Sequence, residues 1–201
     1  AYGYHRYLVE CRVRERFPDA LIVRLPALFG KNLKKNFIYD YMNVIPFMLS
    51  EEKMRELSQK VRVIGNCYEK QAHGYYRVNV PDSGREALME AFRQAGFSAL
   101  YFTDSRSVFQ FYDLRNLWED LKTAIRHGIF LWHPATEPVS AAEVYHKLTG
   151  GTFHNELAGV PAFYDYRTIY DGLYGGRDGY ICDKDRMIEE IKAFVGRYEH
   201  G

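Results

Sequence analysis

Residues 20–25, Ala-Leu-Ile-Val-Arg-Leu, constrain the fold of this chain more than any other stretch. A short and nearly continuous apolar run rich in branched residues is typical of a strand that is buried on both faces, as in a parallel sheet. The preceding residues, 3–17, repeat apolar side chains at helical spacing, and Pro18 ends that helix. Pro26 and Gly30 then end the strand in a loop. A helix followed at once by a buried strand predicts an α/β architecture.

The rest of the chain continues this alternation of helices and strands. We expect helices over 36–60 (with a break near Pro46), 84–96, 113–128, 140–151 and 185–199, and strands over 74–80, 107–112 and 129–134. Asp82 or Ser83 is expected to cap the second of these helices, and Ser140 with Glu143 forms a capping box for the fourth. Residues 98–103 fit either a strand or a packed loop. The sequence therefore predicts an α/β fold with loops that are rich in glycine and tyrosine between residues 151 and 180.

Composition narrows the classes of function. The 201 residues carry a net charge of +1, so no overall field recruits nucleic acid or an anionic membrane. No apolar run approaches the length of a membrane span. The three cysteines are far apart and form no CxxC pair, which indicates reduced thiols in a cytoplasmic protein. His133 and His154 have no neighbours at metal-ligand spacing, so we expect no metal site.

Four stretches of the chain together resemble a known family. "YGYHRYLVE" (2–10) followed by "ALIVRLPALFG" (20–30) resembles the NAD-dependent sugar-nucleotide epimerase/dehydratase family of extended short-chain dehydrogenase/reductases. In that family a Tyr-x-x-x-Lys pair starts a helix, and a Glu of the same helix follows the Tyr by eight residues, as Glu10 follows Tyr2 here. A strand then leads to a loop that runs from an Arg to a Gly, as from Arg24 to Gly30 here. "RSVFQFYDLRNLWEDL" (106–121) and "HPATEPVSAAEVYHKLTG" (133–150) look like later strands and helices of the family. Residues 38–104 match no part of it that we can place.

The resemblance implies a domain organisation. The chain looks like the carboxyl-terminal part of a Rossmann-like extended short-chain dehydrogenase/reductase, with the amino-terminal dinucleotide-binding half absent. Residues 1–36 are then the end of the Rossmann-like core, 37–104 are a substrate-side insertion, and 105–201 are the substrate-binding subdomain with the terminal helices. The family uses NAD or NADP, so the full-length protein is expected to bind one of them. A homodimer is also implied, because the family forms its dimer interface with the helix of the catalytic Tyr.

Tyr2 and Arg6 are the candidate catalytic residues. A cation one helical turn from a phenol favours the phenolate, which lowers the pKa of the tyrosine. The phenolate is then able to take a proton from a sugar hydroxyl while a hydride passes to the nicotinamide. The family's Lys also binds the nicotinamide ribose, so Arg6, which stands in its place, is a cofactor-binding candidate as well. The alternative is that Tyr2 and Arg6 are an exposed Tyr–Arg pair without a catalytic role, because such a pair has the same spacing. Glu10, on the same helix, is expected to have a structural role.

The remaining site residues also follow from the resemblance. The backbone around Pro26 and Leu28 corresponds to the segment that passes the nicotinamide carboxamide. Lys34 and Asn36 are candidates for contacts with the substrate's diphosphate, and a solvated basic loop fits them equally well. Arg106 resembles the base that grips the nucleotide diphosphate in the family, although a surface arginine in a turn is the alternative.

The resemblance therefore implies a fragment of an NAD(P)-dependent enzyme that epimerises, dehydrates or reduces a nucleotide-linked sugar. We expect the fragment alone to be inactive. Two departures from the family, Arg6 in place of Lys and Ala27 in place of Asn, keep an alternative open. The alternative is a module of the same ancestry that does not catalyse but binds a sugar nucleotide or forms a dimer.

Overall fold

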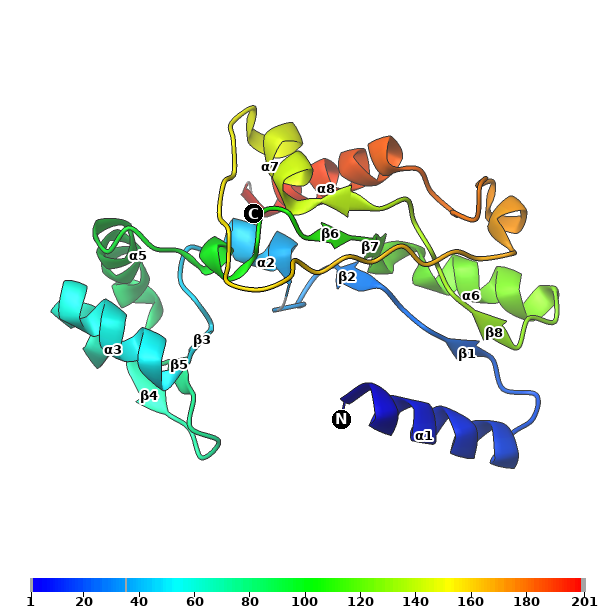
Figure 1. Ribbon diagram of the computed structural model, residues 1–201, viewed down its shortest axis with the longest axis horizontal. Helices are drawn as coiled ribbons and strands as arrows, with labels where there is room; N and C mark the ends of the chain where they lie inside the picture. Colours follow the sequence, from blue (N-terminus) through cyan, green and yellow to red (C-terminus); the bar gives the residue numbers. More distant parts are fainter. Residues whose placement is uncertain (1, 35, 200–201) are drawn as a thin grey trace. The chain divides into compact units, whose positions relative to one another are not determined.

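The chain is a mixed α/β protein that divides into two compact units (Figure 1). The computed structural model describes residues 2–34 and 36–199, apart from the side chains of residues 2, 198 and 199. The first unit joins three stretches of chain, Ala1–Lys31, Arg106–Phe153 and Val160–Gly201. The second unit contains Asn32–Ser105 and His154–Gly159. Each unit is therefore discontinuous in sequence, and each is described below by itself.

Three short strand pairs form the framework of the first unit. Two pairs are parallel and one is antiparallel: β1 (Ile22–Val23) with β8 (Leu131–Trp132) and β2 (Ala27–Phe29) with β7 (Phe111–Asp113) in parallel, and β6 (Val108–Phe109) with β9 (Val139–Ser140) antiparallel. The parallel pairs join residues that are far apart in sequence, which is why each needs a long connection between its strands. The parallel sheet that the apolar run predicts is thus present as short paired segments.

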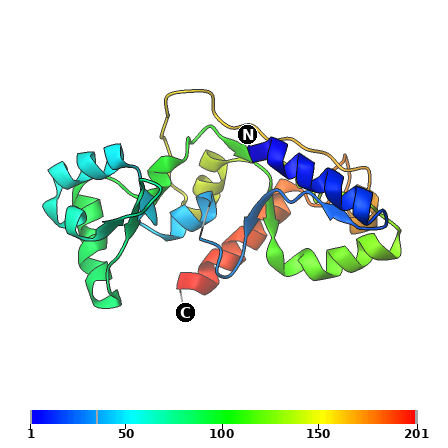
Figure 2. The same ribbon diagram turned by 90° about the horizontal axis from the view of Figure 1, so that it is seen from below.

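Within the described residues of the first unit, four α-helices accompany these strands. They are α1 (Tyr2–Arg16), α6 (Leu117–Arg126), α7 (Ala141–Thr149) and α8 (Lys184–Glu199), with short 3-10 turns at Leu114–Asn116 and Asp171–Tyr174. Helix α7 begins as the sequence predicts, because the Ser140 hydroxyl accepts a hydrogen bond from the backbone of Glu143 at 3.1 Å. Helices α7 and α8 lie side by side in both views (Figures 1 and 2). The ring of Phe194 on α8 packs edge-on against Phe29 of β2, with centroids 5.5 Å apart.

The buried centre of the first unit contains aromatic side chains of β7 and β8; the hydroxyl of Tyr112 is hydrogen-bonded, whereas the indole nitrogen of Trp132 has no hydrogen-bond partner among the described residues. Tyr112 of β7 is 2% exposed, and its hydroxyl donates to the Asp120 carboxylate of α6 at 2.6 Å. Trp132 of β8 is fully buried and stacks on Tyr174 with ring centroids 4.9 Å apart. These contacts fix β7 and β8 against α6 and the 170–174 segment. The ends of β7 and β8 are therefore held in place as well.

The second unit surrounds a small antiparallel sheet. Its strands, β3 (Met48–Leu49), β4 (Tyr68–Lys70) and β5 (Tyr76–Val78), lie in the order β3-β5-β4. The helices are α2 (Phe37–Met42), α3 (Glu51–Lys60), α4 (Arg62–Asn66) and α5 (Arg85–Gln94), with 3-10 turns at Asp82–Gly84 and Ala99–Phe102. Leu57, Ile64 and Phe92, all fully buried, belong to one apolar cluster between these helices and the sheet. The unit therefore has a core of its own.

Several local expectations were wrong. The run at 20–25 is not buried on both faces: Leu25 is 40% exposed, and β1 pairs with β8 alone in the described residues. The stretch 36–60 is not one broken helix, because α2 ends at Met42 and a strand, β3, follows Pro46. Residues 99–102 form a 3-10 turn, and Gly84 stands at the N-cap of α5 in place of Asp82 or Ser83. Strand β4 has no counterpart among the predicted elements.

Candidate functional site

Two adjoining cavities lie beside the ends of the parallel strands in the first unit. Their volumes are about 350 and about 320 Å³, and they share four lining residues, Leu25, Pro26, Gln110 and Tyr166. The other lining residues are Arg24, Ala27, Phe109, His133, Pro134, Ala135 and Tyr164. We call the two cavities together the strand-end cleft. It contains a proline that the resemblance implies for cofactor binding, Pro26.

The parallel pairing of β1 with β8 explains why the cleft forms here. The backbone N–H of Arg24 donates to Trp132 at 3.0 Å, directly after both strands end. Residues 24–27 and 133–135 consequently leave the carboxyl edge of the same strand pair and line the cleft together. In open α/β sheets, ligands bind outside the carboxyl ends of parallel strands. The position of the cleft in the fold is thus one that suits ligand binding.

The side chain of Gln110 organises the floor of the cleft. Gln110 is 1% exposed, and its amide nitrogen donates to the carbonyl oxygens of Thr136 and Tyr166. Its amide oxygen accepts a hydrogen bond from the backbone N–H of Tyr166 at 2.7 Å. The backbone carbonyl of Gln110 accepts a hydrogen bond from the backbone N–H of Ala27 at 3.0 Å. A single buried amide therefore joins three separate stretches of chain around the cleft, with both of its N–H groups and its oxygen satisfied.

An ion pair ties helix α1 to the cleft. The Arg24 guanidinium donates two hydrogen bonds to the carboxylate of Glu10, at 2.9 and 2.8 Å, in the bidentate geometry that suits this pair. Arg14 donates to the same carboxylate at 2.9 Å. The hydrogen bonds from Arg24, above all, hold the pKa of Glu10 below its usual range. Glu10 thus links the helix to the loop, as its expected structural role requires.

His133 lies beside this ion pair in the wall of the cleft. Its Nε2 is 3.4 Å from Nη1 of Arg24. Burial, followed by the positive charge of Arg24, lowers the pKa of His133, so its ring is neutral at pH 7. Because a guanidinium only donates hydrogen bonds, Nε2 is the acceptor and Nδ1 carries the proton. The cleft therefore presents a neutral imidazole next to a permanent cation that is already paired.

The structure places the implied catalytic and cofactor residues in different settings. Arg6 is exposed on α1, and the side chain of Tyr2 lies outside the described residues. Pro26 lines the cleft. Leu28, the next residue of β2 after Ala27, does not line the cleft, and it lies opposite Tyr112 of β7. Of the three whose side chains the structure describes, the cleft thus contains one, Pro26.

The three residues implied for the diphosphate lie on separate elements. Asn36 caps α2, since its side-chain oxygen accepts hydrogen bonds from the backbone of Ile38 and Tyr39. Lys34, also in the second unit, is exposed, with its Nζ 6.0 Å from the centroid of the Phe47 ring. Arg106 is exposed in the first unit, two residues before β6. Capping therefore occupies the oxygen of Asn36, while Lys34 and Arg106 are exposed residues of different units.

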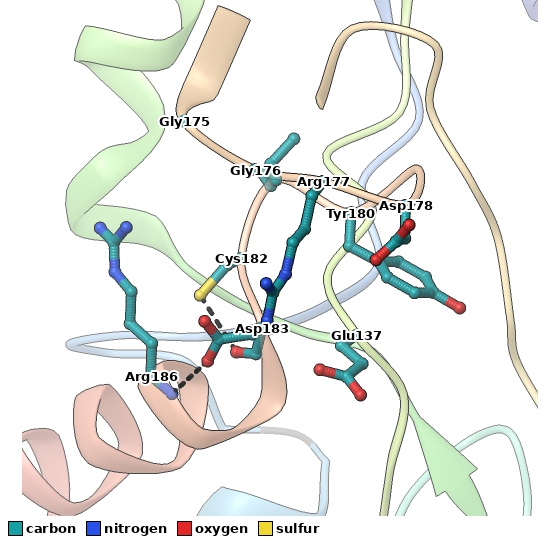
Figure 3. A pocket seen from close by; sticks show the side chains of 10 residues that line it. Glu137, Gly175, Gly176, Arg177, Asp178, Tyr180, Cys182, Asp183 and Arg186 are labelled. Atoms are coloured by element: carbon teal, nitrogen blue, oxygen red, sulfur yellow. Dashed lines mark hydrogen bonds between the residues drawn. The ribbon is translucent and has the colours of Figure 1, made fainter. Parts of the chain in front are cut away.

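A more polar cavity of about 490 Å³ lies at the start of α8 (Figure 3). Arg177 and Arg186 line it together with acidic side chains. Two of these carboxylates already serve the helix: Asp183 accepts from the backbone of Arg186 at 2.8 Å, and Glu137 accepts from that of Lys184 at 2.9 Å. The helix N-terminus, which otherwise attracts anions, is thus occupied by the chain's own carboxylates. We therefore regard the strand-end cleft as the candidate site, although each of its two cavities is smaller than this one.

Comparisons with known protein families, with curated proteins and with solved structures found no match for this chain. Within the described residues, no group of three His, Cys, Asp or Glu side chains is arranged to hold a metal ion. None of the described helices has both the length and the apolar character needed to cross a membrane. A function for the cleft therefore has to be inferred from the residues that line it.

The sequence did not predict three residues of the cleft as ligand contacts: His133, Tyr164 and Tyr166. The two tyrosines lie in the segment that was expected to be an irregular loop. Only the hydrogen bonds to Val108 and Gln110 bring them to the cleft, and neither bond leaves a local pattern in the sequence. The dense aromatic spacing of residues 163–166 was the one available signal.

We expect Gln110→Glu to destabilise the first unit by about 3 kcal/mol, because a carboxylate there faces two carbonyl oxygens without a proton to donate. Urea unfolding followed by tryptophan fluorescence measures this, since both tryptophans, Trp118 and Trp132, lie in the first unit. The matched control is Gln59→Glu, which alters an exposed glutamine of α3. Equal midpoints for the two variants would show that the buried amide does not support the cleft.

We expect Glu10→Gln to loosen α1 without unfolding the rest of the first unit. The lowered pKa of Glu10 means that its ion pair contributes stability above pH 4.5, and that this stability is lost as the pH falls through the lowered value. Because the Arg24 side chain is 45% exposed, solvent screens the pair. We expect amide hydrogen exchange in α1 to rise by roughly two- to fivefold at pH 7. Glu15→Gln, on the exposed side of the same helix, should leave exchange unchanged.

Proposed function

We propose that this chain is the carboxyl-terminal part of an NAD(P)-dependent enzyme that epimerises, dehydrates or reduces a nucleotide-linked sugar. One spatial observation carries the proposal. The segments 2–10, 20–30, 106–121 and 133–150, which resemble the extended short-chain dehydrogenase/reductases, all belong to the first compact unit. Residues 38–104, which resemble no part of that family, belong to the second unit. Resemblance and compactness therefore divide the chain in the same way.

The contacts of α1 add support to this proposal. The helix that bears Tyr2 and Arg6 is tied by the Glu10–Arg24 ion pair to the loop that lines the cleft. In the proposed reaction Tyr2 accepts the proton of a sugar hydroxyl, and Arg6, one turn further on, stabilises the phenolate. The ion pair then keeps the helix of the proton acceptor close to the proposed binding site. Arg106, before β6, remains the proposed contact for the diphosphate in this unit.

The residues of the cleft fit one end of a nicotinamide dinucleotide. When bound, the cofactor supplies the acceptor or donor of the hydride. Leu25 and Pro26 offer the apolar surface that a nicotinamide ring requires. The sequence contains no glycine-rich loop between a strand and a helix that would hold the pyrophosphate. The chain's own residues are therefore proposed to bind the nicotinamide end alone.

We expect Tyr2→Phe to lower turnover by roughly a hundredfold or more in the full-length protein, because it removes the proposed proton-transfer group. Arg6→Lys restores the residue of the family and should keep or raise activity. Arg6→Met should shift the pH–rate profile toward alkaline pH, because the cation that favours the phenolate is gone. Nicotinamide absorbance with nucleotide-sugar substrates measures all three. Wild-type turnover by Tyr2→Phe would reduce α1 to a scaffold and favour the alternative without catalysis.

A specific observation also favours a role of α1 in dimerisation. Tyr4, Tyr7 and Val9 of this helix are 64%, 57% and 59% exposed, and Leu8 is 37% exposed. Tyr4, Tyr7 and Leu8 lie at helical spacing on one face, and a large exposed apolar patch marks an interaction site. A second copy of α1 is a suitable partner, because an isologous contact pairs the same patch with itself. The chain is thus proposed to form a homodimer, with or without catalysis.

We expect the 201-residue chain to self-associate, and the double variant Tyr4→Ala/Tyr7→Ala to weaken that association at least tenfold, since aromatic anchors carry much of the energy of such interfaces. Light scattering over a concentration series measures both. Tyr101→Ala, which removes an exposed aromatic side chain of the second unit, is the control. A monomeric mass for the wild-type chain at every concentration would contradict the dimer.

A further inference from the structure

The strand-end cleft has an aromatic wall. Tyr164 and Tyr166 have ring centroids 6.0 Å apart and planes inclined by 27°, so they form a nearly parallel row. Phe109 continues the row, with its centroid 6.1 Å from that of Tyr164. The two tyrosines are 42% and 52% exposed, and both line the cleft. Flat ring surface is therefore open to a ligand.

The aromatic wall is held in place by its backbone. The N–H of Tyr164 donates to the carbonyl of Val108 at 3.1 Å, and Val108 in turn donates to Ala162 at 2.8 Å. The backbone of Tyr166 is bound on both sides by the buried amide of Gln110, at 2.7 and 2.8 Å. Because the backbone is already ordered, only the side-chain torsions of the rings lose freedom when a ligand stacks on them.

A polar corner shares a cavity with Tyr166. His133 lies there at a tight turn, in which its carbonyl accepts a hydrogen bond from Ala135 at 2.8 Å. Nε2 of His133 faces Arg24, so Nδ1–H is the group of this ring that remains for a ligand. Within the described residues, no side chain or backbone group accepts a hydrogen bond from this Nδ1. The cleft thus offers one directed donor beside one flat apolar surface.

The charge of the cleft is balanced. Arg24 is the one permanently charged side chain among the described lining residues, and the carboxylate of Glu10 holds it in a bidentate pair. An anionic phosphate in the cleft would have to compete with that carboxylate for the guanidinium. An uncharged group does not face this competition.

We propose that the strand-end cleft binds the sugar ring of the nucleotide-linked substrate, with an apolar face of the ring on Tyr166 and a ring hydroxyl accepting a hydrogen bond from Nδ1 of His133. This inference rests on the proposed function, because it assigns the sugar subsite of the same site. A pyranose matches the two walls, since it has C–H groups on its faces and hydroxyls at its edge. Leu25 and Pro26 line both cavities of the cleft, so a sugar in the cavity of His133 and a nicotinamide ring in the other cavity would share this apolar surface.

Saturation-transfer NMR on the 201-residue chain tests the subsite. UDP-glucose, dTDP-glucose and GDP-mannose are the probes, and UDP, dTDP and GDP are their counterparts without a sugar. We expect saturation to reach the pyranose C–H protons of at least one probe. For that probe Tyr166→Ala should weaken binding by roughly five- to tenfold, and Tyr166→Phe should bind like the wild type. His133→Ala should weaken binding about fivefold, the worth of one hydrogen bond.

Two exposed residues of the second unit provide matched controls, because Tyr101→Ala and His154→Ala remove the same kinds of side chain. Both controls should bind the probe like the wild type. If the pyranose protons are saturated but Tyr166→Ala and His133→Ala bind normally, the sugar lies elsewhere and this inference is wrong, while the proposed function stands. If no probe binds the chain, the inference is also wrong, and the turnover of Tyr2→Phe in the full-length protein judges the proposed function separately.

Discussion

The buried amide of Gln110 is the interaction on which the architecture of the first unit most depends. A glutamine between two strands usually costs stability, because its amide must find partners away from water. Here those partners are the backbone groups of Thr136 and Tyr166, which lie in distant parts of the sequence. Thr136 repeats the arrangement, since its hydroxyl donates to the carbonyl of Phe111 at 2.8 Å. Hydrogen bonds from side chains thereby connect segments that the short strands do not join by backbone pairing. The same bonds fix the position of the irregular segment 160–166.

The parallel pairings and the ion pair of α1 complete this arrangement. Because β1 and β2 each pair with a strand from beyond residue 105, the loop between them is supported from both sides. Helix α1 is exposed along most of its length, and the Glu10–Arg24 pair ties it to that loop. The cleft is therefore built on strand ends, while the helix beside it is attached at a few points. Rigid walls beside a loosely held helix suit a site that admits and releases its ligand.

The sequence predicts the helices better than the strands. Helices leave a repeated local pattern, so α6, α7 and α8 lie close to their expected positions, and the Ser140 cap is confirmed. The strands are only two or three residues long, too short for a period, and their pairing is decided by distant residues. For the same reason Pro26 could be predicted as a site residue and Tyr166 could not. Pro26 belongs to a local sequence motif, whereas Tyr166 reaches the cleft through its hydrogen bonds with the distant Gln110. Asn36 shows the converse, since a side chain implied for a ligand caps a helix.

The division of the first unit into three stretches has a consequence for its synthesis. When Ser105 has left the ribosome, nearly all of the second unit is present, whereas β1 still lacks Leu131–Trp132 and β2 lacks Phe111–Asp113. Chains grow by roughly 5–20 residues per second, so β1 and β2 wait for seconds until their partner strands have been synthesised. Assembly of the first unit therefore waits for residues that are translated after most of the second unit, so the second unit is able to form its own core before the first unit is complete.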